Sequence, residues 1–407
     1  MHEIEVSKGV LVLGSGEVGT RISLSLSDAG LAVYHLGNNP GVSHTEYKEY
    51  KDGQHSEYRD EIDRNGSLHP IPSGQLIDLK GQVGNFEALI MRDGKETRLK
   101  IGAIVVAEEP VQRFIREDFG IDLSDRIITQ SQLQERLHPE KQKAAGISGT
   151  AGRVPERICF VLGIASQQGR SPTLNCLENA LMLREKTGSE VCVLCKDLKV
   201  AGNGLEKSYG KARDAGVIFL KYNSMPEFDL NNGVIRISVE DKQLNNNKIS
   251  LSSDLLVLDE ETLPNETFRE ISAILKVNQD EKGFFQDENI NLHPVHSNRR
   301  GIFFLGNCQS DSDQDDILTQ IHLITGNIRD LLSSGRMVVE EKISIEASKC
   351  ALCLTCVRSC PHKAIEPGID EDSGKKCAKV FHEACFGCGI CAAFCPAKAI
   401  NLIQEEQ

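Results

Sequence analysis

The chain has 407 residues, which is enough for two or three domains that each bury a core of their own. Its formal net charge of −13 argues against a nucleic acid or an anionic membrane surface as a direct partner. No N-terminal stretch has the pattern of a signal peptide, and no apolar run approaches the roughly 20 residues of a membrane helix. We therefore expect a cytoplasmic protein with no direct membrane insertion, and the 14 cysteines fit a reducing compartment.

The N-terminal stretch predicts a dinucleotide-binding unit. A strand-like run at residues 9–13 leads into a glycine loop, a helix-like stretch at 17–29 and a second strand at 31–36. This order is typical of the βαβ unit that places a diphosphate at the N-terminus of its helix. The three loop glycines make the tight turn, allow close approach of a diphosphate and permit close packing of helix on strand, in the order Gly14, Gly16 and Gly19.

The second strand of this unit lacks the acidic residue that commonly binds a ribose hydroxyl. Residues 35–39, which stand at this place, include no acidic residue. Asn38 is the candidate to replace it, because its side chain can hydrogen-bond to a ribose hydroxyl. The sequence leaves two alternatives open: Asn38 takes over the ribose contact, or the nucleotide site is degenerate.

The middle of the chain predicts a hairpin or meander, then a linker, then a second α/β unit. Alternating apolar residues at 75–107 indicate the hairpin, and residues 138–155 read as the linker. The second unit starts at a strand-like run at 157–162, and its loop does not form a convincing phosphate-binding fingerprint. Cys192 and Cys195 lie in a strand, where a spacing of three points the side chains to opposite faces, so core packing is the better interpretation.

Eight of the cysteines form two runs with the spacing C-x2-C-x2-C-x3-C-P, which is typical of iron–sulfur cubanes. In such a pair the first three cysteines of each run bind one cluster and the fourth crosses to the other. We call the first predicted set the cluster-1 cysteines: Cys350, Cys353, Cys356 and Cys395. The cluster-2 cysteines are Cys385, Cys388, Cys391 and Cys360.

Zinc is the competing interpretation of these runs, because pairs with C-x2-C spacing also bind zinc. Two proline-terminated runs of four cysteines fit cubanes better. Cys377 lies between the runs and is expected to be a bystander thiol. Cys308 follows a predicted strand, where packing is favoured over a redox role.

Several motifs in a fixed order resemble the A subunit of heterodisulfide reductase and its relatives, which include the A and B subunits of quinone-interacting membrane-bound oxidoreductase. The motifs are the glycine loop and the two cysteine runs, together with the segments 81–86, 127–129, 195–198, 254–258, 282–285, 292–295 and 301–308. The resemblance extends over roughly residues 9–403.

The resemblance implies an FAD domain of the thioredoxin-reductase group, an inserted second α/β domain and a C-terminal ferredoxin-like domain with two [4Fe-4S] clusters. The implied boundaries are 1–150 and 266–340 for the FAD domain, 151–265 for the insert and 341–407 for the ferredoxin-like domain. FAD would lie along the glycine loop, with its isoalloxazine end near Gly306 and Asn307. Where the family has an alanine–threonine–glycine strand end, this chain has Ala107, Glu108 and Glu109.

The function implied by the resemblance is that of an oxidoreductase component that works only within a complex. It would relay electrons between a flavin and the two clusters, toward partner subunits that carry clusters or flavin, among them a membrane-anchored or quinone-linked subunit. The cofactors would carry the chemistry, and no side chain is expected to act as a catalytic acid or base. The alternative is an adaptor subunit without flavin, whose ferredoxin-like domain serves as an electron wire and docking surface.

Overall fold

The computed structural model describes residues 1–37, 66–137, 154–163, 170–198, 200, 204–230, 234–241 and 247–403. Asn38 and most of the predicted linker lie outside these residues. Contacts divide the chain into two compact units. Unit 1 contains residues 1–109, 264–310 and 316–407, and unit 2 contains residues 110–263 and 311–315.

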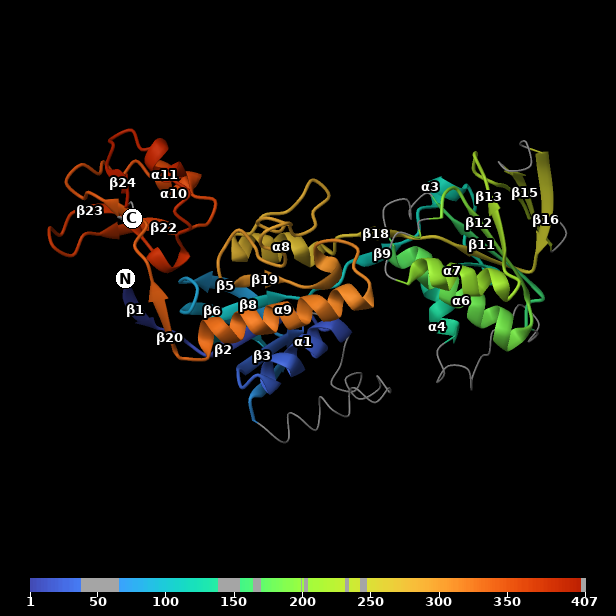
Figure 1. Ribbon diagram of the computed structural model, residues 1–407, viewed down its shortest axis with the longest axis horizontal. Helices are drawn as coiled ribbons and strands as arrows, with labels where there is room; N and C mark the ends of the chain where they lie inside the picture. Colours follow the sequence, from blue (N-terminus) through green and yellow to red (C-terminus); the bar gives the residue numbers. More distant parts are fainter. Residues whose placement is uncertain are drawn as a thin grey trace. The chain divides into compact units, whose positions relative to one another are not determined.

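The core of unit 1 is a five-stranded sheet in which each strand pairs parallel with its neighbours. Its strand order is β19 (Ile302–Phe304), β8 (Ala103–Val106), β2 (Gly9–Leu13), β3 (Ala32–Gly37) and β4 (Leu68–Pro72). All five residues of β2 are buried, as expected for a central strand covered on both faces. The predicted strand–loop–helix–strand unit is present, because α1 (Glu17–Asp28) follows β2 and packs against β2 and β3 (Figure 1).

Two further helices, one strand pair and a three-stranded antiparallel sheet complete the body of unit 1. The sheet is the predicted meander, with strands β5 (Gln75–Lys80), β6 (Phe86–Arg92) and β7 (Lys95–Ile101). The helices are α8 (Glu266–Leu275) and α9 (Gln314–Leu332), and β1 (His2–Glu5) pairs antiparallel with β20 (Arg336–Val339). One stripe of α9 is buried, at Ile317, Ile321, Ile324, Ile328 and Leu332. The helix begins at Gln314, so the second half of the acidic stretch 311–316 is helical.

The C-terminal part of unit 1 is small and rich in turns. Two antiparallel strand pairs frame it: β21 (Ile343–Ile345) with β24 (Ile400–Leu402), and β22 (Ile365–Ile369) with β23 (Lys376–Val380). Its short helices are α10 (Thr355–Ser359), η6 (His382–Ala384) and α11 (Ile390–Ala393). Four of the cysteines of the two runs, Cys356, Cys360, Cys385 and Cys391, belong to its buried core.

Unit 2 repeats the same plan of a five-stranded parallel sheet beside a three-stranded antiparallel one. The parallel order is β10 (Ile127–Thr129), β17 (Leu255–Leu258), β11 (Arg157–Leu162), β12 (Glu190–Cys195) and β13 (Ile218–Lys221). The antiparallel strands are β14 (Glu227–Asp229), β15 (Ile235–Asp241) and β16 (Asn247–Ser253). Its helices are α3 (Arg116–Phe119), α4 (Gln130–Leu137), α6 (Ser171–Thr187) and α7 (Leu205–Asp214).

The contacts place the first boundary after residue 109, earlier than the predicted boundary after residue 150. The reason is strand pairing. β10 pairs parallel with β17, and β9 (Val111–Arg113) pairs antiparallel with β18 (Glu261–Leu263), where the chain enters and leaves unit 2. Together these features give an α/β fold with a dinucleotide-binding type of sheet, an inserted α/β unit and a C-terminal cysteine-rich region.

Candidate functional site: two cysteine cavities and a glycine loop

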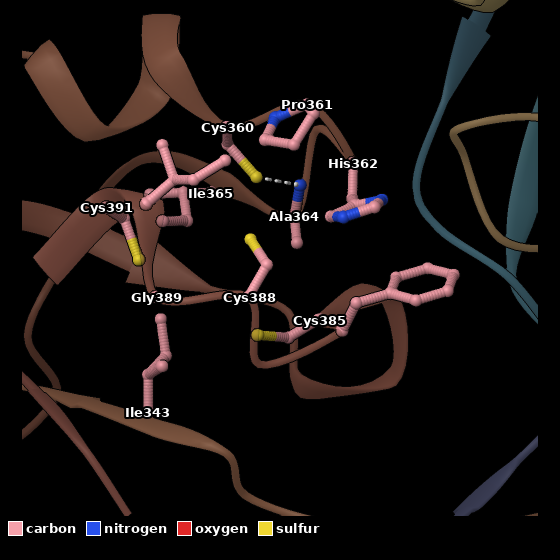
Figure 2. A pocket seen from close by; sticks show the side chains of 12 residues that line it. Ile343, Cys360, Pro361, His362, Ala364, Ile365, Cys385, Cys388, Gly389 and Cys391 are labelled. Atoms are coloured by element: carbon pink, nitrogen blue, oxygen red, sulfur yellow. Dashed lines mark hydrogen bonds between the residues drawn. The ribbon is translucent and has the colours of Figure 1, made fainter. Parts of the chain in front are cut away.

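The cysteines of the two runs surround two separate cavities in the C-terminal region. Figure 2 shows the first, where the cluster-2 cysteines direct their sulfur atoms toward a shared space. The second cavity is lined by the cluster-1 cysteines. In both cavities the fourth cysteine comes from the other run, which is the crossed arrangement that the spacing predicts. Cys377 is buried on β23 and lines neither cavity.

The two fourth cysteines are held in the same way. The main-chain N–H of Ala364 donates to Sγ of Cys360 at 3.4 Å, which Figure 2 marks by a dashed line. The N–H of Ala399 donates to Sγ of Cys395 at 3.3 Å. Lys363 and Lys398, each just before its donor, adopt positive φ angles of 53° and 49°. The two halves of the region therefore repeat one local structure, in which a tight turn after the proline brings an N–H onto the sulfur.

The two cysteine loops differ at two positions that need left-handed backbone. In the second loop these are Gly387 and Gly389, with φ angles of 74° and 78°. In the first loop the equivalent positions are Leu352 and Leu354, with φ angles of 52° and 60°. A leucine in this conformation costs about 1–2 kcal/mol, which glycine avoids. Both leucines line the cluster-1 cavity, so strained backbone places apolar side chains beside it.

The pKa of the buried thiols and that of one exposed thiol are shifted in opposite directions. Burial raises the pKa of Cys356 and Cys385, and it raises the pKa of Cys391 to about 11. At the exposed Cys353, a hydrogen bond with the Thr355 hydroxyl lowers the thiol pKa. Thiolates are the ligands of iron, so cluster assembly has to displace the protons of the buried thiols.

A tetrahedral site for one metal ion is a different geometry. In the ranges that the structure describes, no three His, Cys, Asp or Glu side chains converge on a single ion. This finding concerns single ions and not a four-iron cube. Eight thiols around two cavities, with backbone N–H groups on the sulfurs, fit two cubanes.

The body of unit 1 bonds to the loops that carry cluster-2 cysteines. Asn298 Nδ2 donates to the Pro361 carbonyl at 2.7 Å, and His362 Nδ1 lies 2.9 Å from the Asn298 carbonyl oxygen. The His362 ring stacks on Phe386, with ring centroids 4.1 Å apart. A guanidinium nitrogen of Arg300 donates to the Glu383 carbonyl at 3.1 Å. These contacts lie next to Cys360 and Cys385 in sequence, so the body supports the cluster-2 side of the region.

The glycine loop has the backbone geometry of a dinucleotide site. Gly14 has a φ of 134°, and a Cβ there would overlap the main-chain oxygen of Ala107. A Cβ at Gly19 would overlap the main-chain oxygen of Gly14, so α1 packs tightly on the turn. Gly16 is the N-cap of α1 and provides no side-chain cap. His35 Nε2 lies 2.6 Å from the Gly14 carbonyl oxygen and supports the turn from β3.

The segment after β19 reaches the same helix. Gly306 and Asn307 lie in the short η5 (Gly306–Cys308), and a Cβ at Gly306 would stand 3.3 Å from Cγ1 of Val18 in the first turn of α1. Cys308 is buried and its thiol lies 3.4 Å from the Val106 carbonyl oxygen. Burial raises the pKa of Cys308 far above its ordinary range, which keeps it a neutral, packed thiol.

The backbone of the loop fits a diphosphate, whereas one side chain does not. The carboxylate of Glu109 lies where a Cβ of Gly16 would be, directly over the loop. Glu108, the residue before it, is buried, and its Oε1 has no hydrogen-bond partner within the described structure. The residues that replace the alanine–threonine–glycine strand end thus bring the Glu109 carboxylate to the place of the diphosphate and bury the side chain of Glu108 next to it in sequence.

Two comparisons of sequence found a matching domain model and similar curated proteins. Residues 349–399 match the family model of the 4Fe-4S dicluster domain. The first of two CoB–CoM heterodisulfide reductase iron-sulfur A subunits of Methanopyrus kandleri is 25% identical over 93% of this chain and 72% of its own length. The second A subunit of that organism is 28% identical over 68% of this chain and 44% of its own length. The Methanocaldococcus jannaschii A subunit is 26% identical over 67% of this chain and 43% of its own length.

Solved structures with a similar arrangement are flavoprotein reductases. They include the HOCl-induced flavoprotein disulfide reductase RclA from Escherichia coli, with a TM-score of 0.49, 11% identity and coverage of 91% of this chain and 88% of that chain. Another is thioredoxin reductase from T. acidophilum, with a TM-score of 0.47 and 12% identity. The match covers 81% of this chain and 99% of that chain. None of the described helices is long and apolar enough to cross a membrane.

The curated relatives confirm the predicted resemblance to the A subunit of heterodisulfide reductase. The relation to the quinone-interacting oxidoreductase stays a prediction. The chain spans less than half the length of two of the three relatives named above, so the activities of those proteins do not transfer as a whole.

Proposed function

From the relationship to the heterodisulfide reductase A subunits, we propose that the chain is an electron-transfer subunit of a cytoplasmic redox complex. The observation that carries the proposal is the pair of cysteine cavities in a region that matches a 4Fe-4S dicluster domain. Cubanes exchange single electrons, and the protein sets their potentials through burial, charge and hydrogen bonds to sulfur. The cluster-1 and cluster-2 cysteines are the proposed ligands, with Cys395 and Cys360 as the crossing members.

FAD is the proposed second cofactor, bound along Gly14, Gly16 and Gly19 with its ring end toward Gly306 and Asn307. The glycine loop and the uncapped N-terminus of α1 support a diphosphate there. When bound, FAD would supply an exchange between two-electron and one-electron carriers. The chain's own residues would bind and orient the cofactor. The ribose contact proposed for Asn38 lies outside the described residues.

The proposed partners are redox subunits that carry clusters or flavin, including a membrane-anchored or quinone-linked subunit. Redox partner subunits are supported by two further relatives, which are named as the A subunits of an H2/formate:CoB-CoM heterodisulfide,ferredoxin reductase and of a ferredoxin:CoB-CoM heterodisulfide reductase. The chain itself would contact its partners as a protein surface, without nucleic acid and without inserting into a membrane.

The experiment is anaerobic purification of the full chain followed by iron, sulfide and flavin analysis and stepwise reduction with dithionite. We expect about eight irons per chain and two one-electron steps from the clusters. A chain with zinc or with fewer than about four irons would contradict the proposal. A chain with about eight irons that binds no FAD, even when FAD is added, would instead favour the adaptor alternative. Reduction by NADH or NADPH alone would point to a stand-alone nicotinamide oxidoreductase.

A further inference from the structure

The carboxylate of Glu109 occupies the space beside Gly16 that the missing side chain of this glycine leaves open. A Cβ built on Gly16 would overlap Oε1 of Glu109 and stand 3.1 Å from Oε2. Gly16 has ordinary extended backbone, with a φ of −78°, so its lack of a side chain is not required by its conformation. The open space that a small residue provides is therefore filled by the chain's own carboxylate.

The surroundings of Glu109 are acidic. Loss of water contact at its carboxylate and then the charge of Glu17 raise the pKa of Glu109. Burial and then the charge of Glu109 raise the pKa of Glu108 to about 7. Glu17 itself has an ion pair with Arg21 one turn along α1, at 2.5 Å. A dianionic diphosphate at Gly16 would meet this group of carboxylates, and like charges in contact oppose binding by several kcal/mol.

Glu108 provides a second, independent observation. Its side chain is 8% exposed, and its Oε1 is a buried acceptor without a partner in the described part of the chain. A buried acceptor left unpaired costs free energy, so this position is adapted to a donor or a proton that the folded chain alone does not supply. After β8, Glu108 thus has a carboxylate oxygen without a hydrogen-bond partner in the described structure, and the carboxylate of Glu109 fills the space at Gly16.

Unit 2 shows a related use of a carboxylate. Helix α6 follows the first strand of its βαβ unit, and its first N–H groups, those of Arg170 and Ser171, donate to the Asp311 carboxylate. The Ser171 bond measures 3.0 Å. In each of the two units, the helix that follows the first strand of the βαβ unit thus has an acidic side chain of the same chain at its N-terminus.

We propose that Glu109 determines the affinity of the glycine loop for FAD. Its carboxylate occupies the position of the diphosphate and has to move away before FAD can bind. The side chain can move, because Glu109 lies three residues beyond the end of β8 and is exposed at the surface. The loop then exists in a closed form, with Glu109 on Gly16, and an open form that accepts the diphosphate. The inference rests on the proposed function in taking FAD as the dinucleotide.

The test is titration of FAD into the cluster-loaded full chain under anaerobic conditions, followed by quenching of flavin fluorescence. The variants are Glu109→Gln, which removes the charge at nearly constant size, and Glu109→Ala, which removes both. We expect each to bind FAD at least about tenfold more tightly than the wild type. Glu96→Gln is the matched control, since Glu96 is an exposed glutamate on β7 of the same unit, and its Kd should stay within about twofold of the wild type.

Three outcomes overturn the inference. The wild type binds FAD as tightly as both Glu109 variants, or neither variant binds FAD, or Glu96→Gln tightens binding as much as Glu109→Gln. Iron content is measured on every sample, and we expect it to be equal in all four proteins. A chain without clusters refutes the proposed function, whereas unchanged clusters with no effect of Glu109 refute only this inference.

Discussion

The main-chain carbonyl oxygen of Asn298 lies 2.9 Å from Nδ1 of His362, and the Asn298 side chain donates to the carbonyl of Pro361 at 2.7 Å. Asn298 Oδ1 also accepts the N–H of Asn278 at 3.0 Å. Both Asn298 and His362 are buried. Asn298 thus holds the turn that directly follows Cys360, together with Gln82, whose Nε2 donates to the Lys363 carbonyl at 3.0 Å. The stability of this turn therefore depends on distant parts of the chain.

The Asn298→Ala substitution is expected to loosen this turn. It removes two hydrogen bonds and leaves the Asn278 N–H without its acceptor, at a cost of about 2 kcal/mol. The measurements are the free energy of unfolding and the rate at which limited proteolysis releases residues 341–407. Asn401→Ala is the control, because its bond to Glu346 at 3.0 Å is on the surface, and it should cost less than about 0.5 kcal/mol. Equal effects of the two variants would contradict the role of Asn298.

The crossed cysteine sets predict which substitutions disturb the same cluster. We expect Cys395→Ser to alter the same electron paramagnetic resonance signal as Cys353→Ser, because both cysteines line the cluster-1 cavity. Cys360→Ser should alter the other signal, together with Cys388→Ser. Cys356→Ser and Cys391→Ser, which remove buried ligands, should each lower iron from about eight to about four per chain.

Cys377→Ser is the control for the cysteine series, since Cys377 lines neither cavity. Its iron content should stay at about eight per chain. Loss of iron from this variant would show that the ligand sets are wrong. A common signal for Cys395→Ser and Cys388→Ser would show that the fourth cysteines do not cross.

The glycine loop offers a matched pair of substitutions. Gly14→Ala forces a Cβ into the main-chain oxygen of Ala107 at a φ of 134°, so we expect a loss of at least about 3 kcal/mol in unfolding free energy. Gly16→Ala meets only the end of the Glu109 side chain, which can swing away, and should cost less than about 1 kcal/mol. Denaturant unfolding followed by circular dichroism separates the two. Comparable losses would mean that Glu109 is fixed in place and not mobile.

Local signals in the sequence were sufficient for much of this fold. The β2–α1–β3 unit, the meander at β5–β7 and the spacing within each cysteine run depend on residues that are close in sequence, and all were recognised there. The pairing of β1 with β20 was not, because its register joins His2 to Val339 and neither strand has a strong pattern. The placement of Glu109 on Gly16 and of Asn298 on Pro361 also depends on long-range contacts.

The pH dependence of stability should report on Glu108. Burial, followed by the charge of Glu109, raises its folded pKa from 4.5 to about 7, so between these values the folded chain keeps a proton that the unfolded chain has lost. Stability therefore falls as the pH rises through this window, by about 3 kcal/mol at most. Glu108→Gln should remove this loss and raise the melting temperature at about pH 8 more than at about pH 6.

Glu96→Gln serves as the control for the pH series, because the side chain of Glu96 is exposed on β7. Its melting temperature should follow that of the wild type at both pH values. The raised pKa of Glu109 acts in the same direction, so the double variant with Glu109→Gln should flatten the profile further. A Glu108→Gln variant that is less stable than the wild type at about pH 8 would contradict the assignment.

The strained leucines predict a difference between the two clusters. Leu354 has a φ of 60° where the other loop has Gly389, and it lines the cluster-1 cavity. Leu354→Gly relieves about 1 kcal/mol of backbone strain and opens the cavity to water. Water stabilises the more negatively charged reduced cluster, so the reduction potential of cluster 1 should rise while that of cluster 2 stays unchanged.

Potentiometric titration followed by electron paramagnetic resonance measures both clusters in one sample. Ile369→Gly is the control, since Ile369 is an exposed apolar residue of the same region that lines neither cavity, and it should leave both potentials unchanged. A lower potential for cluster 1 in Leu354→Gly would show that the leucine does not shield the cluster. An equal shift of both clusters would indicate a general loosening of the region, in which case the strain at Leu354 has no specific effect on cluster 1.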